Sequence, residues 1–201
     1  MDYELVPFSQ VNEGDLKQLA LLHHSVMHTL LSDLGPPIVL RYYQIARSDK
    51  SVVGMYAINS SGEITGWAMG SPHPDRINSR LRTPLLWFAV QMLRVMFTRP
   101  SVLLQLISSL LSSSAETEMK NDGVELTYIG VAPDQRGKGL GKTLLRAFVE
   151  ASRSGGYRSV VLSVETDNTA AIRLYEKSGF RLTNTFSEGH YQRHRMELIL
   201  E

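Results

Sequence analysis

Apolar residues follow a helical period near the start of the chain. Residues 3–8 are expected to form a short strand, and Asp15 is expected to cap a helix that continues with apolar residues at helical spacing to about Leu31. A glycine and two prolines at 35–37 interrupt this helix, and Pro37 is expected to open the next one. The N-terminal part therefore predicts one strand followed by two helices.

The middle of the chain changes from a strand-like pattern to an almost continuous apolar one. The β-rich runs 51–58 and 63–70 enclose the sequence Asn-Ser-Ser-Gly and predict a hairpin. Residues 80–113 then contain two very apolar stretches, each preceded by a proline that suits the first turn of a helix. Two apolar helices are expected there.

Strand-like and helical patterns alternate in the C-terminal half. The expected elements are, in order, a strand at 124–131, a helix at 139–153, a strand at 160–164, a helix at 169–178 and strands at 180–186 and 191–200. This alternation predicts an α/β fold in which helices pack on a sheet.

Length and charge limit the class of protein. A chain of 201 residues suits one domain, and 43% hydrophobic with 20% charged residues is an ordinary soluble composition. The net charge is only +1, so no long-range positive field is available for nucleic acid, which binds through many phosphate contacts. Any selectivity for an anion must be local.

The chain has no cysteine, which excludes disulfides, thiolate metal sites and a cysteine nucleophile. Its first residues are acidic and lack the layout of a secretory signal. No stretch approaches the roughly 18 uncharged apolar residues of a membrane span. A cytoplasmic protein is expected.

A basic, glycine-rich loop follows the strand at 124–131. Its residues are Arg136, Gly137, Lys138, Gly139, Leu140, Gly141 and Lys142. The glycines allow close backbone approach and positive φ, and the helix that begins here adds N–H groups with partial positive charge. With three basic side chains as well, a pyrophosphate is the expected guest.

Three phosphate-binding patterns compete for this loop. The nucleotide P-loop needs a glycine at 136, which is arginine, and the dinucleotide pattern needs a glycine at 142, which is lysine. The pattern R-x-x-G-x-G is met in full by Arg136, Gly139 and Gly141. For the loop alone, a solvated glycine-rich turn remains the alternative.

A second group of polar residues lies on the helix at 169–178. Asn168 and Tyr175 are seven residues apart, nearly two turns, so they fall on one helix face. Taken alone, Asn168 is a good N-cap and Tyr175 a core aromatic.

The strand, loop and helix together resemble the GNAT superfamily, the general-control-type N-acetyltransferases. The resemblance covers residues 124–180, while the N-terminal half agrees only in its order of elements. It implies a GNAT fold, an α/β architecture with a mixed central sheet of about six to seven strands flanked by helices. It also implies a single acetyltransferase domain over 1–201, with 80–113 as a helical insertion.

The resemblance further implies acetyl-coenzyme A as acyl donor, with its pyrophosphate on the amides of residues 136–141. The strand backbone at Ile129, Gly130 and Val131 would pair with the pantetheine arm. Asn168 would contact that arm, and Tyr175 would protonate the departing thiolate.

A base is needed because an amine with a pKa near 10.4 is unprotonated about once in 2,500 molecules at pH 7. A positioned base contributes on the order of 10²–10⁴-fold. Glu125 is the leading candidate, because some GNAT enzymes carry a glutamate six residues before the position of Val131. Strand alternation would place it on the face of Thr127 and Ile129. A solvated carboxylate at a strand start is the alternative.

Other GNAT enzymes use a glutamate on the next strand, where this chain has Ser163. Glu165 is displaced by two residues and remains a reserve candidate, as does a water-mediated route. The Val131 N–H is expected to hold the developing oxyanion. Direct attack suits a chain that lacks cysteine.

Residues 80–113 carry more apolar surface than one helix needs, and such surface often marks an interface. A hairpin folded over the core or the acceptor cleft is the first interpretation. A homodimer contact and a membrane-surface contact are the alternatives, the latter because arginines accompany the apolar residues.

His23, His24 and His28 include an i, i+4 pair that could suggest a metal site. No third ligand and no accompanying carboxylate are evident, so a polar helix face or acceptor contacts are favoured and no metal is expected.

The sequence therefore predicts an N-acetyltransferase that moves an acetyl group from acetyl-coenzyme A to a primary amine of a small molecule or peptide. A catalytically weak acyl-coenzyme A-binding or sensing module that acts through 80–113 is the alternative.

Overall fold

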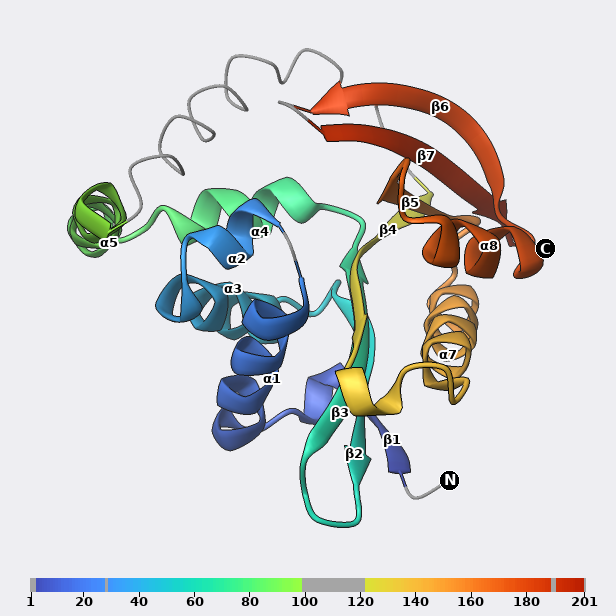
Figure 1. Ribbon diagram of the computed structural model, residues 1–201, viewed down its shortest axis with the longest axis horizontal. Helices are drawn as coiled ribbons and strands as arrows, with labels where there is room; N and C mark the ends of the chain where they lie inside the picture. Colours follow the sequence, from blue (N-terminus) through green and yellow to red (C-terminus); the bar gives the residue numbers. More distant parts are fainter. Residues whose placement is uncertain (1–2, 28, 99–121, 189–190, 201) are drawn as a thin grey trace.

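The computed structural model describes residues 3–27, 29–98, 122–188 and 191–200. Seven strands form one sheet in the order β1-β2-β3-β4-β5-β7-β6 (Figure 1). They are β1 (Tyr3–Pro7), β2 (Val53–Asn59), β3 (Ile64–Ser71), β4 (Gly123–Val131), β5 (Ser159–Glu165), β6 (Arg181–Glu188) and β7 (Tyr191–Ile199). Among the described strands, only β4 and β5 pair in parallel. The expected mixed sheet is confirmed.

Helices cover both faces of this sheet (Figure 1). One face carries α1 (Glu13–Val26), α2 (Leu30–Asp33), α3 (Pro36–Ser48) and α4 (Pro74–Leu81), with α5 (Leu85–Thr98) outside them. The other carries α7 (Leu140–Ser154) and α8 (Thr169–Lys177). Short 3-10 turns η1 (Phe8–Gln10) and η2 (Pro133–Gln135) complete the described elements. A core cluster lies on each face, one around Trp67 and one around Phe148.

The start of α1 differs from the prediction. Asn12, not Asp15, is the N-cap: its side chain accepts a hydrogen bond from the Asp15 N–H at 3.0 Å, and the Asp15 carboxylate accepts one from the Asn12 N–H at 3.1 Å. This reciprocal capping box satisfies two N–H groups of the first turn. The helix also ends at Val26 rather than near Leu31, because the backbone becomes extended at Met27.

The insertion is partly described. The prediction of a helix after the Thr83-Pro84 pair is confirmed by α5, whereas the second apolar helix, expected after Arg99-Pro100, lies outside the described residues. The sequence did not predict α4, which buries only Ile77 and Leu81. Two buried apolar residues are too few to produce a clear helical period.

Candidate active site

The site begins where β4 and β5 separate. Their parallel pairing runs from Gly123 to Leu126 and then ends, while β3 stays paired with β4 as far as Val131. The Ala132 N–H donates to the carbonyl of Thr65, a residue of β3, at 2.8 Å. Because successive N–H groups of a strand point to opposite sides, those of Ile129 and Val131 point away from β3, toward the gap. The outer half of β4 thus offers an open edge.

A β-bulge reorients the side chains of β4 at this point. Leu126 lies opposite Gly70 and Tyr128 opposite Met69, so Thr127 is an extra residue on β4. Leu126 and Ile129 consequently both pack on the α7 face, and Tyr128 packs on the α1–α3 face. The expectation that Glu125 shares a face with Ile129 was therefore wrong, since strict alternation stops at the bulge.

Gly130 is required by packing. A Cβ at this position would lie 2.4 Å from the ring of Trp67, which is completely buried. The indole therefore occupies the space that any other side chain at 130 would need.

The glycine-rich loop forms an uncapped helix start. Gly137 and Gly139 have φ of 75° and 87°, and a Cβ at either would meet nothing within 4 Å, so backbone conformation rather than space requires glycine. Gly139 is the N-cap of α7, no side chain caps the helix, and its first turn has no acidic residue. Exposed Arg136, Lys138 and Lys142 surround the N–H groups of this turn. Such a helix start binds anions.

The open edge and the loop meet at one point. A Cβ at Gly141 would lie 3.7 Å from Val131 Cγ2 and 3.9 Å from Leu174 Cδ2. Strand β4, the start of α7 and helix α8 therefore converge around Gly141. Residues that could hold an extended amide chain lie next to residues that could hold a pyrophosphate, as coenzyme A requires.

Helix α8 brings Asn168 and Tyr175 to this region in different environments. Asn168 is exposed and caps α8, its Oδ1 accepting from the Ala171 N–H at 3.2 Å. Tyr175 is 6% exposed and its ring packs against Phe180, with centroids 5.8 Å apart. Both structural interpretations, helix cap and core aromatic, are confirmed.

Burial raises the pKa of Tyr175 to about 12. The phenol therefore keeps its proton throughout the neutral range, which a proton donor needs.

Glu125 is held by an arginine that the sequence did not single out. Arg195 Nη1 and Nη2 each lie 3.1 Å from a carboxylate oxygen of Glu125, and Nη1 donates to Ser163 Oγ at 3.0 Å. Arg195 lies opposite Ser163 in the β5–β7 register. One guanidinium on β7 thus joins side chains of β4 and β5 where these strands separate. Only the strand register could have revealed it.

Glu165, the reserve base, is the last residue of β5 and lies opposite Arg193 of β7. It is near Tyr191: burial raises the pKa of the Tyr191 phenol, and the charges of Asp33 and Glu165 raise it further. Glu165 therefore lies near the start of β7, apart from the Glu125–Arg195 pair.

His23 does not lie on the polar helix face that was expected. His23 is completely buried, and its Nδ1 lies 2.7 Å from the Tyr43 hydroxyl. Burial, with a smaller contribution from the charge of His24, lowers the pKa of His23 to about 3. His24 Nδ1 contacts the Ser32 carbonyl at 2.9 Å, and His28 lies outside the described residues. Within the described ranges, no group of three or more histidines and carboxylates could hold a metal ion.

Curated relatives match short segments of the chain. The mycothiol acetyltransferase of Renibacterium salmoninarum is 45% identical over 56 residues, which is 28% of this chain and 17% of that protein. That of Corynebacterium glutamicum is 42% identical over 66 residues, 33% of this chain and 21% of that protein. The chain thus covers far less than two thirds of these relatives.

Solved structures match the whole fold. The structure of yncA from Salmonella typhimurium with its cofactor acetyl-CoA has a TM-score of 0.64 and 17% identity, covering 100% of this chain and 95% of that one. The ribosomal-protein-S18-alanine N-acetyltransferase of Escherichia coli has a TM-score of 0.61 and 15% identity, covering 98% and 93%. These likenesses establish the fold.

The family follows from a match over most of the chain. The model of the acetyltransferase (GNAT) family matches residues 22–180, which include the open edge of β4, the glycine-rich loop and helix α8. The chain belongs to the acetyltransferase (GNAT) family.

Proposed function

We propose that this protein transfers an acetyl group from acetyl-coenzyme A to a primary amine of a small molecule or peptide by direct attack. The observation that carries the proposal is the open edge of β4 beyond Leu126 beside the uncapped start of α7. An extended chain of amides and a pyrophosphate need these two features side by side.

The residues present fit the cofactor. Backbone N–H groups of 136–141, with the side chains of Arg136, Lys138 and Lys142, would hold the pyrophosphate. The backbone of Ile129, Gly130 and Val131 would pair with the pantetheine arm, and Asn168 would contact it. When bound, acetyl-coenzyme A supplies the acetyl group as a reactive thioester.

Each step of the transfer is then assigned to a different group of the chain. The Val131 N–H, which points into the gap, donates to the negative charge that develops on the thioester oxygen. Tyr175 holds a proton at its phenol oxygen for the departing thiolate. Glu125 takes the proton of the amine, directly or through water, in an orientation set by Arg195. Glu165 is the reserve base.

The second candidate function is an acyl-coenzyme A-binding or sensing module with weak catalysis. The exposed apolar residues of α5 favour it, because they offer a contact surface outside the site. Under either function, 80–113 would contact a second copy of the chain or a membrane surface. A single domain over 1–201 and a cytoplasmic location stay part of the proposal.

Calorimetry with acetyl-coenzyme A tests cofactor binding, which both functions require. We expect binding at submillimolar cofactor, weakened by the double substitution Arg136→Ala/Lys138→Ala and unchanged by the control Lys17→Ala at an exposed position of α1. No binding at these concentrations would contradict both functions.

Thiol release separates the two. The panel comprises polyamines, amino sugars, aminoacyl termini and simple primary amines. Turnover on any member supports the transferase, and binding without turnover on all of them supports the module.

A further inference from the structure

Helix α5 is apolar around nearly its whole circumference. On its inner side, Trp87 and Met92 pack against the core cluster of the α1–α3 face, and Val95 is 5% exposed. Figure 1 views this helix end-on at the margin of the molecule, on the far side of α3 and α4 from the sheet. Its other side therefore faces away from the protein.

The outer side is a continuous apolar stripe. Leu86, Val90, Leu93 and Phe97 follow one another at intervals of four, three and four residues, which places them on one helix face. Leu86 and Phe97 are 79% and 78% exposed. Of the nine large apolar side chains that are exposed in the described part of the chain, six belong to α5. This surface marks a contact site.

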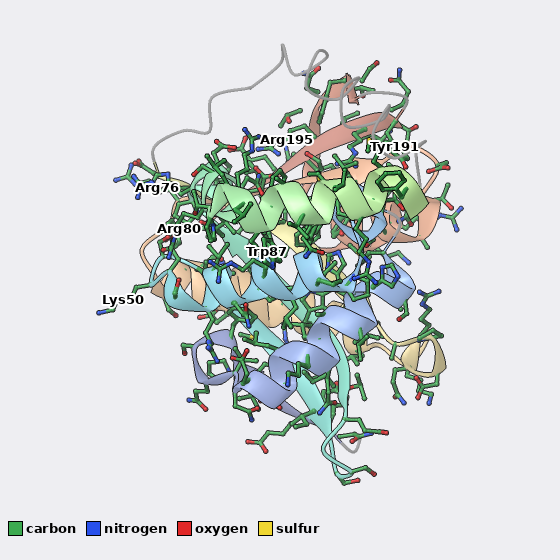
Figure 2. All side chains as sticks on the ribbon, turned by 90° about the vertical axis from the view of Figure 1, so that its left-hand side faces the viewer. Lys50, Arg76, Arg80, Trp87, Tyr191 and Arg195 are labelled. Atoms are coloured by element: carbon green, nitrogen blue, oxygen red, sulfur yellow. The ribbon has the colours of Figure 1, made fainter. Side chains whose placement is uncertain are left out.

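Positive charge is concentrated beside the stripe. Residues 74–98 contain four arginines and one aspartate, a net charge of +3, whereas the whole chain has +1. The arginines are Arg76, Arg80, Arg82 and Arg94, all exposed. In Figure 2, which looks directly at α5, Arg76 and Arg80 lie toward one end of this face, where Asp49 offsets part of their charge.

We propose that α5 lies in the plane of an anionic lipid surface, with the apolar stripe below the headgroups and the arginines on the lipid phosphates. In-plane helices have this combination of an apolar face and flanking basic residues. Among the described residues, no helix is long and apolar enough to cross a membrane.

A second copy of the chain fits the same surface less well. An isologous contact across α5 would bring together two surfaces that both carry a net positive charge. A stable interface buries about 800 Å² of accessible surface per partner, more than one face of a 14-residue helix about 21 Å long supplies.

Vesicle co-sedimentation of the full chain tests the proposal. We expect binding to vesicles of phosphatidylcholine with a quarter phosphatidylglycerol, little binding to pure phosphatidylcholine, and release by high salt. Leu86→Glu/Phe97→Glu should lower the partition coefficient at least tenfold. Arg76→Gln/Arg82→Gln should lower it about 30-fold, at about fivefold per charge. Leu182→Glu, which replaces a side chain 55% exposed on β6, is the matched control and should bind normally.

Three outcomes would overturn the proposal. One is undiminished binding of Leu86→Glu/Phe97→Glu. Another is a dimer in sedimentation velocity that this variant dissociates, which would assign the stripe to a second copy. The third is a marked fall in the Tm of Leu86→Glu/Phe97→Glu in the absence of lipid. Such a fall would mean that Leu86 and Phe97 are already covered by the chain itself. Thiol release in lipid-free solution should be unchanged and provides the folding control.

Discussion

Tyr175 is deeply buried, and it lies on the face of α8 that begins at Asn168. Its proposed role as the acid leads to a direct prediction. The pKa of about 12 keeps the phenol protonated over the assay range. We expect Tyr175→Phe to lower turnover about 10²–10⁴-fold, the usual contribution of a positioned acid, and to leave acetyl-coenzyme A affinity nearly unchanged. Thiol-release kinetics and calorimetry measure the two quantities.

The pH profile supplies a second readout for Tyr175. Because its pKa lies near 12, the wild-type rate should show no loss from Tyr175 titration between pH 6 and pH 10. A rate that Tyr175→Phe leaves unaltered would remove this residue as the acid. A matched control is Tyr157→Phe, whose half-buried phenol lies outside the site.

The Glu125–Arg195 pair makes a prediction about both stability and rate. Glu125→Gln should lower turnover on the order of 10²–10⁴-fold if the carboxylate accepts the amine proton. It should also cost about 1.5–3 kcal/mol, because Arg195 loses a charged partner at a largely enclosed site. Urea denaturation and amine-saturation kinetics measure these changes.

A double-mutant cycle separates the structural from the chemical role. Glu125→Gln/Arg195→Met should be more stable than the sum of its single variants predicts, since no unpaired charge is left at the site. Its turnover should stay low. If turnover recovered with stability, Glu125 would only hold the strands together and the base would be elsewhere.

At the scale of elements, the two glycines of the α7 start are expected to differ. Gly139→Ala should lower the free energy of unfolding by about 1–2 kcal/mol, because the residue has a φ of 87°. It should also weaken acetyl-coenzyme A binding, since the anion loop must change shape. Thermal denaturation and calorimetry measure both effects.

Gly141→Ala is the matched comparison. Its Cβ would make only ordinary contacts, at 3.7 Å and 3.9 Å, so stability should be kept or slightly increased by helix propensity. Affinity should nevertheless fall, because the methyl group enters the space between β4 and α8. If both substitutions destabilised the protein equally, a positive φ would not be what requires glycine at 139 rather than at 141.

The sequence predicted the elements of this site better than their junctions. Positive φ at Gly139 and the strand–loop–helix order depend on residues that are close together in the sequence. A short motif is therefore enough to predict them. The bulge at Thr127 does not, because it arises from the pairing of β4 with β3 and leaves no pattern in β4 itself. One extra residue was enough to reverse the expected face of Ile129.

Contacts between strands that are far apart in the sequence could not be predicted, for the same reason. Arg195 is 70 residues from Glu125, and only the adjacency of β4, β5 and β7 brings their side chains together. The buried position of His23 was equally hidden, because its neighbours Tyr43, Trp67 and Tyr128 come from three other elements. Periodicity describes one element at a time.

At the scale of the whole molecule, the sheet separates two cores with different tasks. The core on the α7 face supports Tyr175 and the anion loop, and the family motifs are concentrated there. The core on the α1–α3 face contains His23 and the ring of aromatic residues around it, and α5 packs outside it. Motifs therefore identify the donor, while the opposite face carries few recognisable signals.

His23 makes the stability of the protein depend on pH through this second core. Its folded-state pKa is about 3, whereas an unfolded histidine titrates near 6.5. The unfolded chain therefore binds a proton that the native chain excludes, and this contribution to stability is complete above pH 6.5 and lost as the pH falls toward 3. The slope is about 1.4 kcal/mol per pH unit, so the loss by pH 5 is about 2 kcal/mol.

Urea unfolding of wild type and His23→Gln at pH 7.5 and pH 5 tests this link. Glutamine does not titrate and can still hydrogen-bond to the Tyr43 hydroxyl, so the variant should lose about 2 kcal/mol less than wild type between the two pH values. The difference between pH values matters here, because the substitution also changes stability at any single pH. His73→Gln, at an exposed position, should behave like wild type. A pH dependence that His23→Gln leaves intact would mean that His23 accepts its proton in the folded protein, and that the aromatic core opens to water at moderate acidity.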